Sequence, residues 1–436
     1  MKYWAIVHER RVAIVDEHRN GEGYQVARNG LIAALDIGTT KVCCFIARAD
    51  EESVRVTGIG HQISKGMRGG VITDMDDVEA CIRTAVDAAE RMADETLEDV
   101  FVNLSGGFPA SHTVGVEVAI AGHAVTDSDL NRVLDHARTR HEPGERQVVH
   151  AIPVGFTIDG SRGIRDPRGM YGERLGVNMH VVTAATGPLR NLSVCVERCH
   201  LTMADMALSQ YASGLACLVE DEMDLGVTIV DMGGGTTNMG VFYDGSLIHA
   251  DSVAIGGGHV TTDIARGLSA PVNHAERLKT LYGSAVPSPS DAGEIIAVPQ
   301  VGESEEESVN HMPRSLLIGI IKPRLEETFE LVRDRLTSSG VDKLAGRRVV
   351  LTGGASQLHG VRDLAARVLD KQVRVGRPIR LQGLAESTAG PAFATCGGLL
   401  FYAARKQAEE LDAGTTAKGR SPGRLQRIGK WLRENF

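Results

Sequence analysis

The sequence contains no apolar run long enough to cross a membrane. A helix that spans a bilayer needs about 20 predominantly apolar residues, and charged residues interrupt every apolar run of the first segment, MKYWAIVHERRVAIVDEHRN. This segment also lacks the continuous apolar stretch of a signal peptide. We therefore expect neither a transmembrane helix nor a leader, and we interpret residues 1–29 as a poorly ordered N-terminal extension.

Disulfide patterns and an excess of positive charge are also missing. The seven cysteines are odd in number and form no C-x-x-C pair, which is typical of a reduced, intracellular protein. The formal charge of −9, from 47 basic and 56 acidic residues, argues against a dedicated nucleic-acid-binding protein. The length of 436 residues suffices for about two to four domains, each with its own core.

A P-loop of the form G-x-x-x-x-G-K-[ST] is absent, but two glycine-threonine turns share another plan. The segment LIAALDIGTTKVCCFIARA predicts a buried strand over 31–37, a turn at Gly38-Thr39-Thr40 and a second strand over 42–47. The segment GVTIVDMGGGTTNMGVFYDG predicts a strand ending at Asp231, a turn over 233–237 and a resumed strand. The shared order of apolar strand, Asp, Gly, Thr-Thr and apolar strand indicates a diverged internal repeat.

The residues of these turns suit a polyphosphate. Glycines let backbone N–H groups approach phosphate oxygens, and Lys41 can neutralise a phosphate as a point charge. Asp36 and Asp231, each at a strand end, can hold Mg²⁺ through its waters. One such turn would be typical of an ordinary hairpin, whereas two matching turns favour a clamp. The candidate contacts are Asp36, Gly38, Thr39, Thr40, Lys41, Gly233, Gly234, Gly235, Thr236 and Thr237, with Asp36 and Asp231 as metal ligands.

Two further glycine clusters and one charged pair extend this candidate site. In RRVVLTGGASQLHG the pattern predicts a strand over 349–351, a turn and a helix from about Leu358, and such a helix start suits a sugar or a phosphate. In VAIGGGHVTTDIARGL a strand leads into a helix from about Val260. Glu276 and Lys279 lie on one helical face, either as a solvated ion pair or as the edge of a nucleotide pocket.

At these residues the sequence resembles the actin-like ATPase superfamily. LDIGTTK is similar to its first phosphate motif, VDMGGGTTN to its second and LTGGAS to its adenosine motif. The segments KGMRGGVITDMDDVEACIRTAVDAAE, VFVNLSGG, RLGVNMHVVTA and IKPRLEETFELVRDRL, with the C-terminal tail, resemble the FtsA family of bacterial division proteins. The resemblance implies a two-lobed α/β fold with ATP and Mg²⁺ in the cleft. It places Gly353, Gly354 and Ser356 along the ribose and adenine, and Gly257, Gly258, Glu276 and Lys279 at the nucleotide edge.

The resemblance also implies a division of the chain. The first lobe (1A) covers 30–112 and 180–204, an inserted subdomain (1C) 113–179, the second lobe (2A) 205–258 and 331–398, its cap (2B) 259–330, a closing helix 399–411 and a linker 412–423. In the insertion, Thr126 and Asp129 fit a capping box. In the cap, Pro323 is expected to kink or divide the helix RSLLIGIIKPRLEETFELVRDRL.

One departure from the superfamily bears on catalysis. Chaperone-like members carry a Glu in NEPTAAALA that activates the attacking water, and the segment SQYASGLA places Gln210 at this position. A glutamine can orient a water molecule but cannot accept its proton as a carboxylate does. Phosphoryl transfer depends largely on positioning and charge, so we expect ATPase activity to be slow or weak, with Gln210 as the water-orienting residue.

The C-terminal segment SPGRLQRIGKWLRENF predicts an amphipathic helix over 424–436. Its apolar face carries Leu425, Ile428, Leu432 and Phe436 with Trp431 at the edge, and Arg427 and Lys430 lie opposite. A basic face opposite an apolar face with an interfacial aromatic is typical of a helix in an anionic lipid headgroup layer. The alternatives are a helix docked on the protein itself and a helix for a partner's groove.

The resemblance implies a function in division. It implies a protein that polymerises, binds FtsZ through the second-lobe cap, tethers FtsZ filaments to the cytoplasmic face of the inner membrane at the septum, and contacts later division proteins through the inserted subdomain. Two other readings within the superfamily are a PilM-like scaffold of pilus assembly, which generally lacks such a tail, and a sugar kinase, which needs an Asp base between the lobes. A DnaK-type chaperone is excluded by the missing C-terminal substrate domain.

Overall fold

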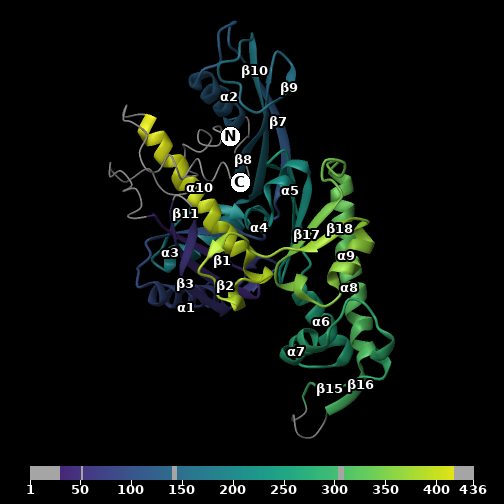
Figure 1. Ribbon diagram of the computed structural model, residues 1–436. Helices are drawn as coiled ribbons and strands as arrows, with labels where there is room; N and C mark the ends of the chain where they lie inside the picture. The colour runs from purple at the N-terminus through teal and green to yellow at the C-terminus, as the bar shows by residue number, and fades with distance from the viewer. Residues whose placement is uncertain (1–29, 51–52, 140–144, 303–308, 417–436) are drawn as a thin grey trace.

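The computed structural model describes residues 30–50, 53–139, 145–302 and 309–416. Two large sheets form the centres of two lobes, and a smaller sheet projects from the first lobe (Figure 1). The expected two-lobed α/β fold with an inserted subdomain is confirmed. Among the described residues, no helix has both the length and the apolar character needed to cross a bilayer. The predicted N-terminal extension and membrane helix lie outside the described residues.

The first lobe is built on a six-stranded sheet with helices on both faces. Its strands in spatial order are β11 (Thr202–Leu208), β6 (Asp99–Leu104), β1 (Leu31–Ile37), β2 (Lys41–Ala49), β3 (Val54–Ile63) and β19 (Leu381–Gln382). Helices α1 (Met75–Ala93) and α3 (Thr186–Arg198) cover one face, while α4 (Ser209–Cys217) and α10 (Ala394–Thr416) cover the other (Figure 1). This sheet includes all of β11, which ends at Leu208, and also β19 from the C-terminal part of the chain. The first lobe therefore extends past residue 204, where its second segment was expected to end.

Helix α1 shows how the apolar pattern selects the buried face. Val78, Ile82, Ala85 and Ala89 are buried as their spacing predicts, but Met92 is 59% exposed. A Cβ on Gly58 of β3 would lie 2.8 Å from Ala93 Cβ. Ala93, rather than Met92, therefore faces the sheet in the last turn.

The inserted subdomain is a four-stranded sheet with one helix. Its strands in spatial order are β7 (Ala110–Ala119), β10 (Arg174–Ala185), β8 (Arg146–Ile158) and β9 (Ser161–Ile164), and α2 (Asp127–Thr139) packs on β7 and β10. The predicted capping box is confirmed: Asp129 Oδ2 accepts the Thr126 N–H at 3.0 Å, and Thr126 Oγ1 accepts the Asp129 N–H at 3.3 Å. Because β7 and β10 pair over ten residues, the unit is wider than the expected 113–179.

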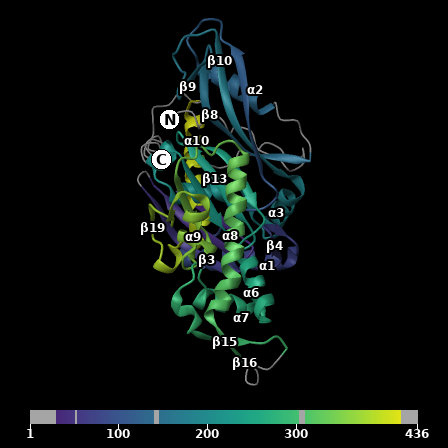
Figure 2. The ribbon, with the colours of Figure 1, turned by 90° about the vertical axis from the view of Figure 1, so that its right-hand side faces the viewer.

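The second lobe has a five-stranded sheet and a helical cap. Its strands in spatial order are β14 (Ser246–Val253), β13 (Thr237–Tyr243), β12 (Val227–Met232), β17 (Arg348–Thr352) and β18 (Gln372–Val375). The helices are α5 (Glu220–Leu225), α6 (Gly257–Leu268), α7 (Val272–Tyr282), α8 (Arg314–Ser338) and α9 (Val361–Leu369). The cap ends in the hairpin of β15 (Ile295–Pro299) and β16 (Val309–Pro313), far from the inserted subdomain (Figure 2).

Helix α8 is continuous through Pro323, so of the two expected outcomes, a kink or a division, the division is wrong and the kink stays a prediction. A proline ring crowds the carbonyl of the residue four positions earlier, which here is Gly319. No atom outside the neighbouring backbone of the helix lies within 4 Å of the position that a Cβ on Gly319 would take, so no other element crowds the helix at this residue.

Helix α10 is longer than the closing helix expected over 399–411. It begins at Ala394 and ends at Thr416, so the first five residues of the expected linker are helical. The helix packs on β1 and crosses α4. The two helices are so close that a Cβ on Gly398 would lie 1.7 Å from Ala212 O. The C-terminal helix of the described chain is therefore part of the first lobe's core.

Candidate functional site

The two glycine-threonine turns lie in contact, although they belong to different lobes. The turn after β1 closes with Gly38 N donating to Lys41 O at 2.9 Å, and the turn after β12 closes with Gly233 N donating to Thr236 O at 2.9 Å. A Cβ on Gly234 would lie 2.3 Å from Thr40 Cγ2, and a Cβ on Gly235 would lie 2.5 Å from Thr39 Oγ1. Only glycine fits this approach, so the predicted convergence of the two turns is confirmed.

Two carboxylates and one ammonium group stand at the base of the turns. Asp36 accepts the Lys41 ammonium group at 3.2 Å. Burial lowers the pKa of Lys41, but the charge and hydrogen bond of Asp36, together with Cys43 and Cys396, outweigh burial, so the pKa lies above its usual value. Burial and the neighbouring charge of Asp36 raise the pKa of Asp231 to about 6, against the opposing effect of the hydroxyls that donate to it. The negative charges of Asp36 and Asp231 therefore repel each other across the lobes when no ligand is bound.

Two residues that the sequence did not predict, Thr395 and Ser213, donate their hydroxyls to Asp231. Thr395 Oγ1 of α10 donates to Asp231 Oδ2 at 2.8 Å, and Ser213 Oγ of α4 donates to the same oxygen at 3.1 Å. Ser213 lies one turn from Gln210 in the segment singled out for catalysis, so that segment offered a signal. Thr395 is 164 residues from Asp231, and no local pattern indicates it.

Asn103 fixes the end of β1. Its Oδ1 accepts the Ile37 N–H at 2.7 Å, and its Nδ2 donates to Ser209 Oγ at 3.1 Å. A buried amide with partners on both sides resists reorientation. Asn103 therefore ties the strand that carries Asp36 to the first residue of α4.

Helix α6 begins at Gly257, three residues earlier than expected, and its first N–H groups are already used. Gly257 N donates to Gly233 O at 2.9 Å, and Gly258 N donates to Gly234 O at 2.8 Å. The first N–H groups of a helix have no acceptor within the helix and need other partners. Here carbonyl groups of the second turn accept these hydrogen bonds, so the helix can start on glycine. In this structure Gly257 and Gly258 hold the second turn in place.

The predicted pair of Glu276 and Lys279 is present and reaches the same helix start. The Lys279 ammonium group lies 2.7 Å from Glu276 Oε2, 2.8 Å from Thr261 Oγ1 and 3.2 Å from Gly257 O. Lys279 is mostly buried, with 14% of its side chain exposed. Lys279 therefore packs against the start of α6, whereas half of the Glu276 side chain is exposed; a contact with nucleotide stays a prediction.

The third glycine segment packs against the second turn, but its helix starts later than expected. Residues 354–357 form a short 3₁₀ turn, and α9 begins at Val361 rather than near Leu358. Gly353 has a φ of +84°, and a Cβ there would lie 2.4 Å from Asp231 Oδ1. Ser356 is buried, and its hydroxyl donates to Gly353 O at 2.7 Å, so Ser356 stabilises the turn from inside.

Gln210 does not reach the two turns. Its side chain is 1% exposed, packs beside Gly240 and donates to Asp251 O at 3.4 Å. Its Oε1 has no hydrogen-bond partner among the described residues. The neighbour of Asp231 on this helix is Ser213. The water-orienting role of Gln210 stays a prediction.

A turn between two short strands joins the site to the root of the inserted subdomain. Between β4 (Met67–Arg68) and β5 (Val71–Ile72), Gly70 N donates to Thr39 Oγ1 at 3.1 Å. A Cβ on Gly70 would lie 2.9 Å from the backbone of Gly106, which precedes β7, whereas a Cβ on Gly69 would meet nothing within 4 Å.

This contrast gives a matched pair of variants. Gly69 and Gly70 both have positive φ, so alanine costs about 1 kcal/mol of strain at either position. Only Gly70→Ala adds a backbone clash, and we expect its free energy of unfolding to fall by about 1–3 kcal/mol more than that of Gly69→Ala. Urea unfolding measures the difference, and equal losses in both variants would contradict the Gly70–Gly106 contact.

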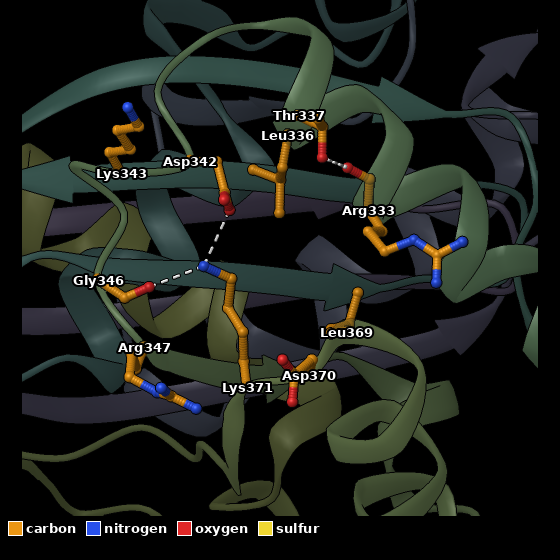
Figure 3. A pocket seen from close by; sticks show the side chains of 10 residues that line it. All are labelled: Arg333, Leu336, Thr337, Asp342, Lys343, Gly346, Arg347, Leu369, Asp370 and Lys371. Carbon is orange, nitrogen blue, oxygen red and sulfur yellow. Dashed lines mark hydrogen bonds and ion pairs between the residues drawn. The ribbon is translucent and has the colours of Figure 1, made fainter.

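A separate pocket lies at the far end of α8 and contains none of the predicted site residues. Its volume is about 420 Å³, and Lys371 lies in it between Asp342 Oδ1 at 2.9 Å and Gly346 O at 2.7 Å (Figure 3). Its lining residues are Arg333, Leu336, Thr337, Asp342, Lys343, Gly346, Arg347, Leu369, Asp370 and Lys371. Helices α8 and α9 both end here, and cations near a helix C-terminus offset its partial negative charge.

Comparison with solved structures identifies the fold. The chain superposes on the PilM–PilN type IV pilus biogenesis complex with a TM-score of 0.61 and 16% identity, covering 85% of this chain and 98% of that one. It superposes on MreB5 of Spiroplasma citri with a TM-score of 0.52 and 12% identity, covering 88% and 98%. These likenesses establish the actin-like architecture.

Comparison with sequences identifies the family. The family described as "Cell division protein FtsA" matches residues 228–398, and the "SHS2 domain inserted in FTSA" matches residues 106–183. Cell division protein FtsA of Rhizobium meliloti is 46% identical over 424 residues, which cover 94% of this chain and 96% of the relative. FtsA of Pseudomonas aeruginosa is 35% identical and that of Escherichia coli K12 33% identical, each over 93% of this chain and 98% of the relative. With an actin-like fold, the inserted SHS2 unit and near-complete coverage by these relatives, the chain belongs to the FtsA family of bacterial cell division proteins.

Proposed function

We propose that the protein binds Mg²⁺·ATP between its lobes, polymerises, and tethers FtsZ filaments to the cytoplasmic face of the inner membrane during division. The observation that carries the nucleotide part is the contact between the two glycine-threonine turns. Each turn brings backbone N–H groups and hydroxyls, and Lys41 adds a positive charge beside them. MreB5 of Spiroplasma citri, which shares the fold, was solved with ADP and with AMPPNP.

The residues present fit this ligand. Glycines at 234 and 235 let the backbone of the second turn approach the hydroxyls of Thr39 and Thr40 closely, and glycine backbones also let N–H groups reach phosphate oxygens. The carboxylate oxygens of Asp36 and Asp231 are the donors that Mg²⁺ prefers, and two of them leave room for the waters that it keeps. Bound Mg²⁺ would supply neutralisation of phosphate charge. Lys41 would exchange part of its contact with Asp36 for a phosphate oxygen.

Weak hydrolysis belongs to the same proposal. The carboxylate that acts as a base in chaperone-like relatives is replaced by Gln210, whose amide lies against Asp251 O rather than against the two turns. A glutamine does not take up a proton as a carboxylate does. We infer that nucleotide acts mainly as a conformational ligand that closes the lobes.

Attachment to the membrane completes the proposal. The predicted helix over 424–436 follows soon after α10, which ends at Thr416, and its basic residues would each contribute about 1 kcal/mol near an anionic surface. A single helix of this kind binds weakly, and a polymer carrying many helices binds through avidity. Polymerisation would thus convert nucleotide binding into membrane attachment, with FtsZ contacts assigned to the cap and later division proteins to the inserted subdomain.

Full-length variants test the tether. We expect the unsubstituted protein to float with phosphatidylglycerol-containing vesicles, more so with ATP, and to bring purified FtsZ with it. Ile428→Glu combined with Leu432→Glu should reduce flotation at least tenfold, because two charges enter the apolar face. The control Gln426→Ser changes a polar position and should float normally. Unchanged flotation of the double variant would refute the membrane helix, and flotation without FtsZ would refute the tether.

A further inference from the structure

The start of helix α10 enters the site between the two turns. The preceding 3₁₀ turn ends at Phe393, and Thr395 and Cys396 follow within the first turn of the helix. Cys396 Sγ contacts Cys43 O at 3.6 Å and Ala34 O at 3.7 Å, on the two strands of the first hairpin. The helix start is therefore anchored in the hairpin that carries Asp36 and Lys41.

Thr395 holds the carboxylate of the other lobe. Its hydroxyl donates to Asp231 Oδ2 at 2.8 Å, and Ser213 occupies the same oxygen from α4 at 3.1 Å. Thr395 and Asp231 are 8% and 5% exposed. A buried carboxylate whose one oxygen receives two hydroxyl donors cannot rotate freely, so the direction of Asp231 Oδ1 is set by these donors.

Phe393 supports the ammonium group. The Lys41 ammonium nitrogen lies 4.4 Å from the centre of the Phe393 ring, within the range of a cation–π contact. The ring is held in turn by Phe45, with stacked centroids 5.9 Å apart, and by the edge of His61 at 6.0 Å. With Asp36 on one side at 3.2 Å and the ring on another, Lys41 is confined to one region.

We propose that Thr395 and Phe393 are positioning residues for a metal-bound nucleoside triphosphate, Thr395 through Asp231 and Phe393 through Lys41. This inference rests on the proposed nucleotide function. It adds two residues that lie outside the two phosphate motifs and the adenosine motif. The two residues act on different groups. Loss of the Thr395 hydroxyl should affect the metal-dependent part of binding, whereas loss of the Phe393 ring should affect the phosphate contact with or without metal.

Binding measurements on the full chain test the assignment. We expect Thr395→Val to weaken ATP binding about tenfold in Mg²⁺ and less than threefold in EDTA, because a misdirected Asp231 matters only when Mg²⁺ is present. Thr395→Ser retains the hydroxyl and should restore the affinity. Phe393→Leu should weaken ATP binding by the same factor in the Mg²⁺ buffer as in the EDTA buffer. Isothermal titration calorimetry gives the dissociation constants.

A matched control separates positioning from a structural role. Thr328 of α8 is also buried, and its hydroxyl donates to Arg324 O at 2.8 Å, away from the site. Thr328→Val should lower the thermal midpoint without changing ATP affinity. The proposal is overturned if Thr395→Val binds Mg²⁺·ATP normally, if Thr395→Ser fails to restore binding, or if Thr328→Val loses as much affinity. An unsubstituted chain that binds no ATP would instead overturn the proposed function.

Discussion

Replacing Gly398 with alanine is expected to destabilise the protein by at least about 3 kcal/mol. Gly398 lies where α10 crosses α4, and an added Cβ would stand 1.7 Å from Ala212 O and 2.2 Å from Ala212 C. Both obstructing atoms belong to the backbone, so no side chain can move aside. Overpacking of a well-packed core typically costs about 1–3 kcal/mol, and separating two helices costs more.

The opposing contribution is small. Alanine favours a helix over glycine by about 1 kcal/mol, which cannot offset the clash. The control is Gly187→Ala in α3, where no atom lies within 4 Å of the added Cβ; this variant should be as stable as the unsubstituted protein or slightly more stable. Urea unfolding followed by circular dichroism compares the two. A stable Gly398→Ala protein would mean that α4 and α10 are not in contact at this point.

The second large effect is expected at Asp231. Asp231→Ala removes one of the two carboxylates proposed to hold Mg²⁺, and we expect Mg²⁺·ATP affinity to fall about 100-fold, which corresponds to about 2.7 kcal/mol. Asp231→Asn keeps an acceptor for Thr395 and Ser213 but removes the charge, so it should lose nearly as much. Affinity that stays within threefold in either variant would remove Asp231 from the site.

The same variant should be more stable than the natural protein when no ligand is bound. The pKa of Asp231 is raised to about 6 in the folded state, against about 3.9 in an unfolded chain, so the charged carboxylate opposes folding. The penalty is absent below about pH 3, where the carboxyl group is protonated in both states, and it grows to about 3 kcal/mol above pH 6. Asp231→Asn should therefore gain stability over the natural protein as pH rises from 4 to 7 in ligand-free buffer. A stability difference that does not change with pH would contradict the raised pKa.

Short sequence motifs correctly predicted those parts of the fold and the candidate site that depend on residues close together in the chain. Both glycine-threonine turns, their flanking strands and the capping box of Thr126 and Asp129 follow from short-range rules of turns and caps. The turns converge because two similar hairpins face each other, which a repeated pattern indicates. The predicted pair of Glu276 and Lys279 also forms, since residues three apart share a helical face.

Long-range partners could not be predicted in this way. Thr395 meets Asp231 only because α10 returns to the first lobe after the second lobe is complete, and no spacing in the sequence encodes this return. Helix α6 starts early, at Gly257, because carbonyl groups of the second turn accept its first N–H groups. Glycine's low helix propensity points to a later start, so the sequence alone did not predict this. The continuity of α8 through Pro323 likewise could not be predicted from the local rule that proline interrupts a helix.

Helix α10 has a mechanical consequence for the proposed membrane tether. Its 23 residues make a rod about 35 Å long, and Thr395 near its start donates a hydrogen bond to Asp231. In the proposed tether, a pull on the lipid anchor would therefore enter the folded body through α10, whose first turn donates a hydrogen bond to Asp231 Oδ2.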